Sequence, residues 1–335
     1  MAVVVGVAIP ATSAHPEKYL VPEEEDMMST NFAGVVVGFD GSAPSTAALD
    51  WAAAEAVRRD LPLRVVLAVE LGTALPMPMD SGTPWAMAKI EAAATEVLAD
   101  AVDRARKTDP GLVVESSLVI DTAVAALVAA SRTAQLVVVG NRGHGDLMGT
   151  ILGSVAFGVT AHAQCPVAVV RGDSLRVPGP GAPVVVGVDG SESSNAAVDE
   201  AADLAERAGA PLHVVAAYQV MATGWVGVST WTDMYPEEEL AEAAEGTAKA
   251  ALAQARERIR RNHPDLATEF TAVRARPADA LAERSRTAGV VVVGSRGRGG
   301  FRSLVMGSVS RGLAHLAESP VLIVHAPGRE YLGDA

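Results

Sequence analysis

Short runs of valine and other β-branched residues alternate with alanine-rich stretches through most of the chain. In the first half, the apolar runs predict strands at 35–39, 64–69, 112–119, 136–140 and 167–171. The alanine-rich stretches predict helices at 44–59, 86–107, 123–132 and 153–163. Continuously apolar strands that alternate with helices indicate a parallel sheet with right-handed crossovers. We therefore predict an α/β, doubly wound, Rossmann-like fold with helices on both faces of the sheet.

The same pattern returns in the second half of the chain, which indicates a tandem repeat. The segment VVVGFDGS at 35–42 returns 149 residues later as VVVGVDGS. The segment VVVG at 137–140 returns 154 residues later, which predicts a short insertion between the second strand and second helix of the second copy. The strands predicted in that copy are 184–188, 212–217, 267–275, 290–294 and 321–325. The chain is therefore predicted to contain two copies of one domain.

Composition shifts along the chain predict the domain boundaries. We expect a flexible N-terminal tail at 1–32, a first domain at 33–171, a Gly- and Pro-rich linker at 172–182, a second domain at 183–327 and a C-terminal tail at 328–335. An arm that docks on a neighbouring molecule is the alternative for the N-terminal segment.

The composition supports two packed domains and limits their partners. Hydrophobic residues make up 49% and charged residues 20% of the 335 positions, which is enough for two cores. The net charge is −13, and the acidic excess is spread over both halves, which argues against nucleic acid and membrane as partners. No apolar run reaches the ~18 residues of a membrane span. Cys165 is a lone cysteine, and residues 1–10 lack a basic start, so we expect a cytoplasmic protein.

Glycine-bearing turns follow the first and fourth predicted strands of each copy, where a doubly wound sheet binds its ligand. Glycines allow a close backbone approach and a positive φ, which turn N–H groups toward an anion. A serine at a helix start adds a hydroxyl and free amides, and nearby arginines add positive charge. Such turns also serve simply to connect strand and helix, but their recurrence in both copies favours a polyphosphate site. The Walker lysine and the Rossmann glycine fingerprint are both absent.

These residues resemble the tandem, ATP-binding form of the universal stress protein family, whose nucleotide motif is G-x2-G-x9-G-[ST]. The spacing fits Gly140, Gly143, Gly153 and Ser154, and it fits again 154 residues later. The resemblance covers residues 33–327. It implies a five-stranded sheet of order 3-2-1-4-5 in each half and one ATP per domain.

The resemblance also implies which residues bind ATP. In the first half they are Gly38, Asp40, Ala68, Gly140, Asn141, Arg142, Gly143, His144, Gly145, Asp146, Gly153, Ser154 and Val155. In the second half they are Gly187, Asp189, Ala217, Gly294, Ser295, Arg296, Gly297, Arg298, Gly299, Gly300, Gly307, Ser308 and Val309.

Within this set, the two aspartates at the first strand ends are expected near the ribose and adenine, away from the phosphates. Asp146 stands where the second copy has Gly300. An acidic group there would either weaken phosphate binding or help to hold Mg²⁺ or Mn²⁺. We predict no metal site formed by the protein alone.

The expected function is a nucleotide-dependent stress-response or growth regulator that acts through contacts between proteins. The expected partners are ATP, a second copy in a homodimer and an unknown regulatory protein, with the apolar strands at 166–170 and 320–324 as contact edges. No convincing base stands at the phosphate end, so we predict no catalytic residue and at most slow ATP hydrolysis. The alternatives are an adenylating enzyme of the related α-hydrolase-like group and, more weakly, a flavin-binding domain.

Several other features have two interpretations. The connections at 71–85 and 220–235 are long enough to be lids over the nucleotide or subunit contacts. His144 is either a phosphate contact or an exposed loop residue. His162, His315 and Cys165 are expected to be structural.

Overall fold

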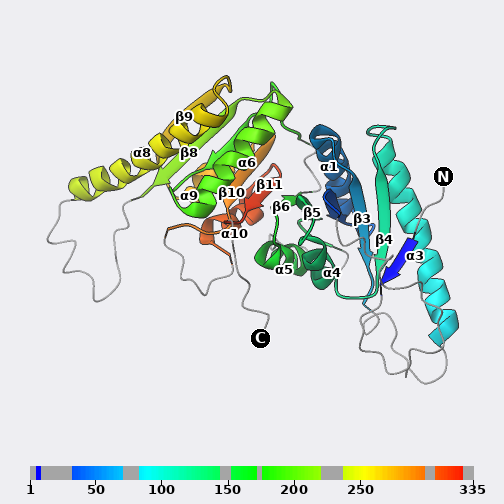
Figure 1. The fold of residues 1–335 in the computed structure, drawn as a ribbon. Coiled ribbons are helices and arrows are strands. Elements are labelled where there is room, and N and C mark those ends of the chain that lie inside the picture. The colour runs from blue at the N-terminus through cyan, green and yellow to red at the C-terminus, as the bar shows by residue number, and fades with distance from the viewer. Residues whose placement is uncertain are drawn as a thin grey trace, which may run out of the picture. The chain divides into compact units, whose positions relative to one another are not determined.

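The computed structural model describes residues 5–8, 32–70, 83–143, 152–171, 176–219, 237–298 and 306–326. The chain divides into two compact units, Met1–Leu175 and Arg176–Ala335. Each unit contains a parallel sheet with helices packed on it (Figure 1).

The first unit has the predicted doubly wound fold. Its strands are β1 (Val5–Ala8), β2 (Val35–Gly38), β3 (Leu63–Ala68), β4 (Val114–Val119), β5 (Leu136–Gly140) and β6 (Val167–Val170). Its helices are α1 (Ala43–Arg59), α3 (Thr83–Arg106), α4 (Ala123–Ala130) and α5 (Ser154–His162). The strands are parallel in the order β1-β4-β3-β2-β5-β6. Without β1, this is the predicted order 3-2-1-4-5.

Strand β1 is an addition that the sequence pattern did not predict, because it lies within the segment expected to be a flexible tail. It runs parallel to β4, with Val5 opposite Ser116 and Ala8 opposite Val119 (Figure 1). An edge strand such as β4 presents unpaired N–H and C=O groups, and the valine-rich start of the chain suits pairing with them. Residues 9–31 of the same segment lie outside the described residues.

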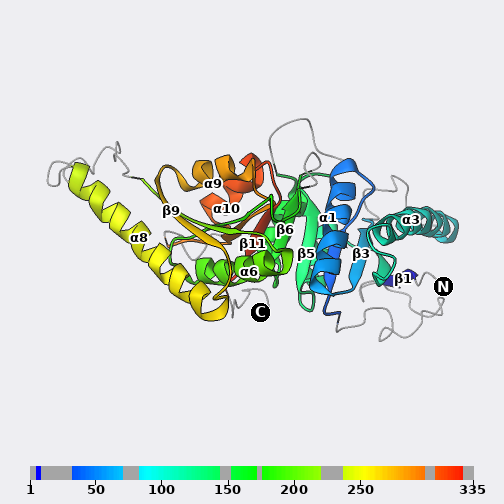
Figure 2. The same cartoon turned by 90° about the horizontal axis from the view of Figure 1, so that it is seen from above.

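The second unit repeats this arrangement. Its strands are β7 (Val184–Gly187), β8 (Leu212–Tyr218), β9 (Thr268–Arg274), β10 (Val290–Gly294) and β11 (Val321–Val324). Its helices are α6 (Glu192–Ala208), α8 (Glu237–Asn262), α9 (Pro277–Ser285) and α10 (Ser308–Leu316). The order β11-β10-β7-β8-β9 is again the predicted one. Figure 2 shows α6 and α8 on one face of the sheet and α9 and α10 on the other.

The element bounds place the insertion of the second copy. Strand β8 begins 149 residues after β3, whereas helix α8 begins 154 residues after α3. The extra residues therefore lie between the second strand and the second helix, as predicted.

Local signals explain where the first helix of each unit begins and ends. The hydroxyls of Ser42 and Ser191 accept hydrogen bonds from the amides of Ser45 and Ser194, each at 3.3 Å. Such an N-cap stabilises a helix by about 1 kcal/mol. Both helices end at a residue in the left-handed conformation, which is an aspartate in α1 and a glycine in α6.

A repeated ion pair joins the first two helices of each unit. In the first unit, Nε of Arg104 lies 2.6 Å from Asp50. In the second unit, Arg258 makes the equivalent pair with Asp199. The hydrogen bond to the carboxylate raises the pKa of each arginine, against a smaller opposing effect of burial. The packing of helix on helix is thus the same in both halves.

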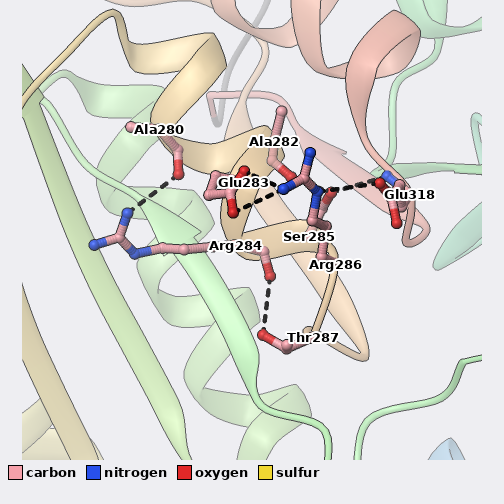
Figure 3. A network of polar contacts seen from close by, with 8 residues as sticks. All are labelled: Ala280, Ala282, Glu283, Arg284, Ser285, Arg286, Thr287 and Glu318. Atoms are coloured by element: carbon pink, nitrogen blue, oxygen red, sulfur yellow. Dashed lines mark hydrogen bonds and ion pairs between the residues drawn. The ribbon is translucent and has the colours of Figure 1, made fainter.

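A repeated serine connects the third and fourth helices of each unit. The hydroxyl of Ser285 donates to the carbonyl of Ala282 and accepts the amide of Glu318 at 2.8 Å (Figure 3). In the first unit, Ser131 makes the equivalent bond with the amide of Gln164 at 2.9 Å. The second unit adds ion pairs from Arg286 to two glutamates, at 2.7 Å and 3.2 Å (Figure 3).

Candidate functional site

Each unit has a cavity at the carboxyl ends of its first and fourth strands, which is where the strand order reverses. The first cavity lies at the ends of β2 and β5 and the second at the ends of β7 and β10. Each has a volume of about 350 Å³, within the range of small-molecule sites. The cavities therefore lie where a doubly wound sheet binds its ligands.

Most of the predicted site residues that the structure describes line these cavities. In the first cavity they are Gly38, Asp40, Ala68, Gly140, Arg142, Gly143, Gly153, Ser154 and Val155. In the second they are Gly187, Asp189, Ala217, Gly294, Arg296, Gly297, Arg298, Gly307, Ser308 and Val309.

Two predicted residues, Asn141 and Ser295, are buried and do not line the cavities. Their backbones instead tie the loop to its surroundings. The carbonyl of Asn141 accepts the amide of Gly153 at 2.9 Å, and the carbonyl of Ser295 accepts that of Gly307 at 2.8 Å. The predicted residues His144, Gly145, Asp146, Gly299 and Gly300 lie outside the described residues, as do most of the two long connections proposed as lids.

The helix that begins at each cavity has no side-chain cap. Helices α5 and α10 follow Gly153 and Gly307, neither of which can make a side-chain hydrogen bond to the first turn. In contrast, the first helix of each unit is capped by a serine. Within the described part of the chain, the first-turn amides of α5 and α10 thus have neither an intrahelical acceptor nor a capping side chain. This arrangement favours an anion at the helix start, where the helix dipole is also favourable.

An arginine in each cavity has an unused donor. Arg142 and Arg296 line the two cavities, and the Nε atom of each is buried without a hydrogen-bond partner among the described residues. A buried unsatisfied donor costs about 1–3 kcal/mol. An anion held between this donor and the helix start would remove that cost.

The aspartate at the end of the first strand of the second unit contacts the loop that follows the fourth strand. One oxygen of Asp189 accepts the amide and hydroxyl of Ser191, at 2.9 Å and 2.6 Å. Its other oxygen, Oδ2, accepts the amide of Arg298 at 3.0 Å, in the loop expected to hold phosphates. This hydrogen bond joins the ends of the neighbouring strands β7 and β10. The expected place of the two aspartates near the ribose and adenine stays a prediction.

The described glycines differ between the two kinds of turn at the cavity. Positive φ is found at Gly41 and Gly190, in the turns after the first strands, as expected for glycine-bearing turns. The described glycines of the loops after the fourth strands do not have it, and they serve close packing. A Cβ atom on Gly297 would lie 2.6 Å from Oδ2 of Asp189, and one on Gly140 would lie 2.8 Å from the backbone carbon of Pro44. The glycines thus let the two turns at the cavity approach each other.

Comparison with known proteins identifies the family. The model of the universal stress protein family matches residues 32–171 and 182–325. The chain belongs to the universal stress protein family. Universal stress protein Rv2005c from Mycobacterium tuberculosis is 37% identical over 297 residues, which cover 87% of this chain and 96% of that protein. Universal stress protein Rv2623 from the same organism is 36% identical over 295 residues, which cover 87% and 95%.

The fold is also found among solved structures. A universal stress protein from Archaeoglobus fulgidus has the same fold, with a TM-score of 0.64 and 20% identity; the match covers 90% of this chain and all of that one. A universal stress protein solved in complex with cAMP is 31% identical; the match covers 43% of this chain and 97% of that one, with a TM-score of 0.33.

The structure adds cavity residues that the family motif did not point to. Leu127 of α4 and Leu281 of α9 line the two cavities, and each side chain is almost fully buried. Each leucine adds apolar surface to its own cavity. The two leucines are 154 residues apart, so the second repeat offset was a signal that could have found them.

The described residues set limits on other kinds of site. Across them, no three His, Cys, Asp or Glu side chains come together in a way that could hold a metal ion. Within the same ranges, none of the helices combines the length and apolar character that crossing a membrane requires.

Proposed function

We propose that each half binds one adenine nucleotide, ATP, in the cavity at its strand ends. The single observation that carries this proposal is the repeated pairing of an uncapped helix start with a buried, unpartnered arginine Nε. Both features call for an anion at the same end of the cavity.

The rest of the cavity suits the nucleoside. Ala68 and Ala217 stand at or near the ends of the second strands, and Leu127 and Leu281 supply further apolar surface to the two cavities. We assign these apolar residues to the adenine. The carboxylates of Asp40 and Asp189, which also line the cavities, would accept hydrogen bonds from the ribose hydroxyls.

The phosphates would lie on the amides of Ser154 and Val155 in the first half and of Ser308 and Val309 in the second. A Mg²⁺ or Mn²⁺ ion would be held mainly by phosphate oxygens. Within the sequence of the phosphate motif of the first half, 140–154, the acidic residue is Asp146.

The proposed role is regulation rather than turnover. The carboxylates that line the described part of the cavities are Asp40 and Asp189, and each already accepts hydrogen bonds from the serine two residues later. We infer that nucleotide binding alters contacts with a second copy of the chain or with a regulatory protein during stress.

Mass spectrometry of gently purified protein tests this proposal. We expect about two adenine nucleotides per chain, and a marked loss of bound nucleotide in the double variant Arg142→Gln/Arg296→Gln. Arg260→Gln is the matched control, because Arg260 lies on α8 and pairs with Glu257 outside both cavities. Protein that neither retains nor binds an adenine nucleotide, or that carries a flavin instead, would overturn the proposal.

A further inference from the structure

The two cavities have equivalent backbone and serine positions, but the described residues that line them differ in charge. Arg142 and Arg296 occupy equivalent positions, as do Ser154 and Ser308. The second cavity is lined in addition by Arg298. At the repeat offset of 154, the first half has His144 instead.

The backbone of Arg298 is fixed at the mouth of the second cavity. Its amide donates to Oδ2 of Asp189 at 3.0 Å. Its guanidinium lies against the neighbouring turn, since a Cβ atom on Gly190 would be 2.6 Å from Nη2 of Arg298. The same Cβ would be 3.3 Å from Oε1 of Gln254 on α8. The arginine therefore stands beside the cavity, and not in bulk solvent far from it.

The charge of Arg298 is available to a ligand. The side chain is exposed, and among the described residues no carboxylate forms an ion pair with its guanidinium. Its hydrogen bond to Asp189 uses the backbone amide, so the guanidinium keeps its donors.

The sequence extends this difference beyond a single residue. The phosphate motif of the first half, 140–154, contains one arginine and one aspartate, for a formal charge of zero. The motif of the second half, 294–308, contains three arginines and no acidic residue, for a formal charge of +3. Because attraction to a polyphosphate grows with the charge on both partners, the charge of Arg298 in the lining of the second cavity favours each added phosphate.

We infer that the two sites are not equivalent: the second selects nucleoside triphosphates, whereas the first accepts nucleotides with fewer phosphates nearly as well. This inference rests on the proposed nucleotide binding and adds the number of phosphates that each site prefers. Arg298 is the residue that sets the difference in phosphate preference. The amides at the helix start are common to both halves, and they serve the phosphate nearest to them in each.

Isothermal titration calorimetry of the full chain with ATP, ADP and AMP tests the inference. For ATP we expect two classes of site that differ at least ~10-fold in Kd, equivalent to ~1.4 kcal/mol. For AMP we expect the two classes to merge. Arg296→Gln should remove the tight ATP class, and Arg142→Gln should remove the weak one, which assigns each class to its half.

Two swaps provide matched controls. Arg298→His gives the second half the residue of the first, and should weaken ATP binding by about tenfold while leaving AMP binding within about twofold. His144→Arg makes the reverse exchange and should tighten ATP binding at the weak class. A merely structural role of Arg298 would weaken ATP and AMP equally.

The possible failures are distinguishable. Equal ATP affinity of the two classes, or an unchanged preference for ATP over AMP in Arg298→His, would overturn the inference and leave nucleotide binding intact. No heat and no binding with any of the three nucleotides would overturn the proposed function as well.

Discussion

The first helices of the two halves occupy equivalent places, yet they bury different chemistry at one position. Glu55 of α1 and Leu204 of α6 are 149 residues apart, and both are fully buried. Glu55 forms ion pairs with Arg58 and Arg59, whose side chains are only 14% and 7% exposed. In the second half, Ala208 takes the place of Arg59. The fold thus dictates burial at this position, and the neighbouring residues decide whether a charge is tolerated there.

The largest effect on stability is expected from removing the buried carboxylate of Glu55 in the first half. Glu55→Leu should destabilise the first half by about 3–5 kcal/mol, because it removes the fully buried partner of an ion-pair cluster with the half-buried Arg58 and Arg59. Adding Arg59→Ala should recover a large part of the loss. Hydrogen-exchange mass spectrometry can follow each half separately, and Leu204→Met is the conservative control in the other half. A single Glu55→Leu variant as stable as the parent would show that the ion pairs are not needed.

A second difference lies at the end of the same helices. Asp60 and Gly209 both have a left-handed backbone, with φ of 54° and 58°. The Cβ position of Gly209 is open, so Gly209→Ala should cost about 1 kcal/mol through backbone strain alone. The reciprocal change Asp60→Gly should stabilise the first half by less than about 1 kcal/mol. Urea unfolding checks both changes. A loss of stability in Asp60→Gly as large as the loss in Gly209→Ala would contradict this explanation.

The ion pairs around Arg286 should matter less. Glu318→Gln gives the second half the residue that the first half has at Gln164, and it keeps the backbone hydrogen bond to Ser285. Because the pair is exposed on both sides, the loss should be about 0–1 kcal/mol. Ser285→Ala, which removes the buried hydroxyl, is the comparison variant and should cost more. Thermal unfolding of both variants gives the order, and the reverse order would assign the stabilising role to the ion pair.

The smallest effect concerns pH. Hydrogen bonds from Arg260 and Arg261 hold the pKa of Glu257 below its ordinary value of 4.5. A lowered carboxylate pKa contributes stability that is present above the ordinary value and is lost as the pH falls through the lowered one. Unfolding curves of Glu257→Gln should therefore differ from the parent near neutral pH and converge in acid. A gap that widens in acid would contradict the sign.

The sequence predicted the features that depend on local pattern and repetition. The strands, their order and the cavity positions follow from apolar runs, glycine-bearing turns and two repeat offsets. Strand β1 was missed because its partner is more than a hundred residues away along the chain. The burial of Glu55 is not predictable from the local pattern, since a charged side chain is rarely fully buried unless it is paired. The contact of Asp189 with Arg298 depends on two strand ends that meet only in the folded sheet.

A crystal structure of the full chain grown with ATP tests the central claim most directly. We expect a triphosphate in each half within hydrogen-bonding distance of the first-turn amides of α5 and α10, and of Nε of Arg142 and Arg296. Nucleotide bound elsewhere on the molecule, with both cavities closed by side chains, would contradict the account.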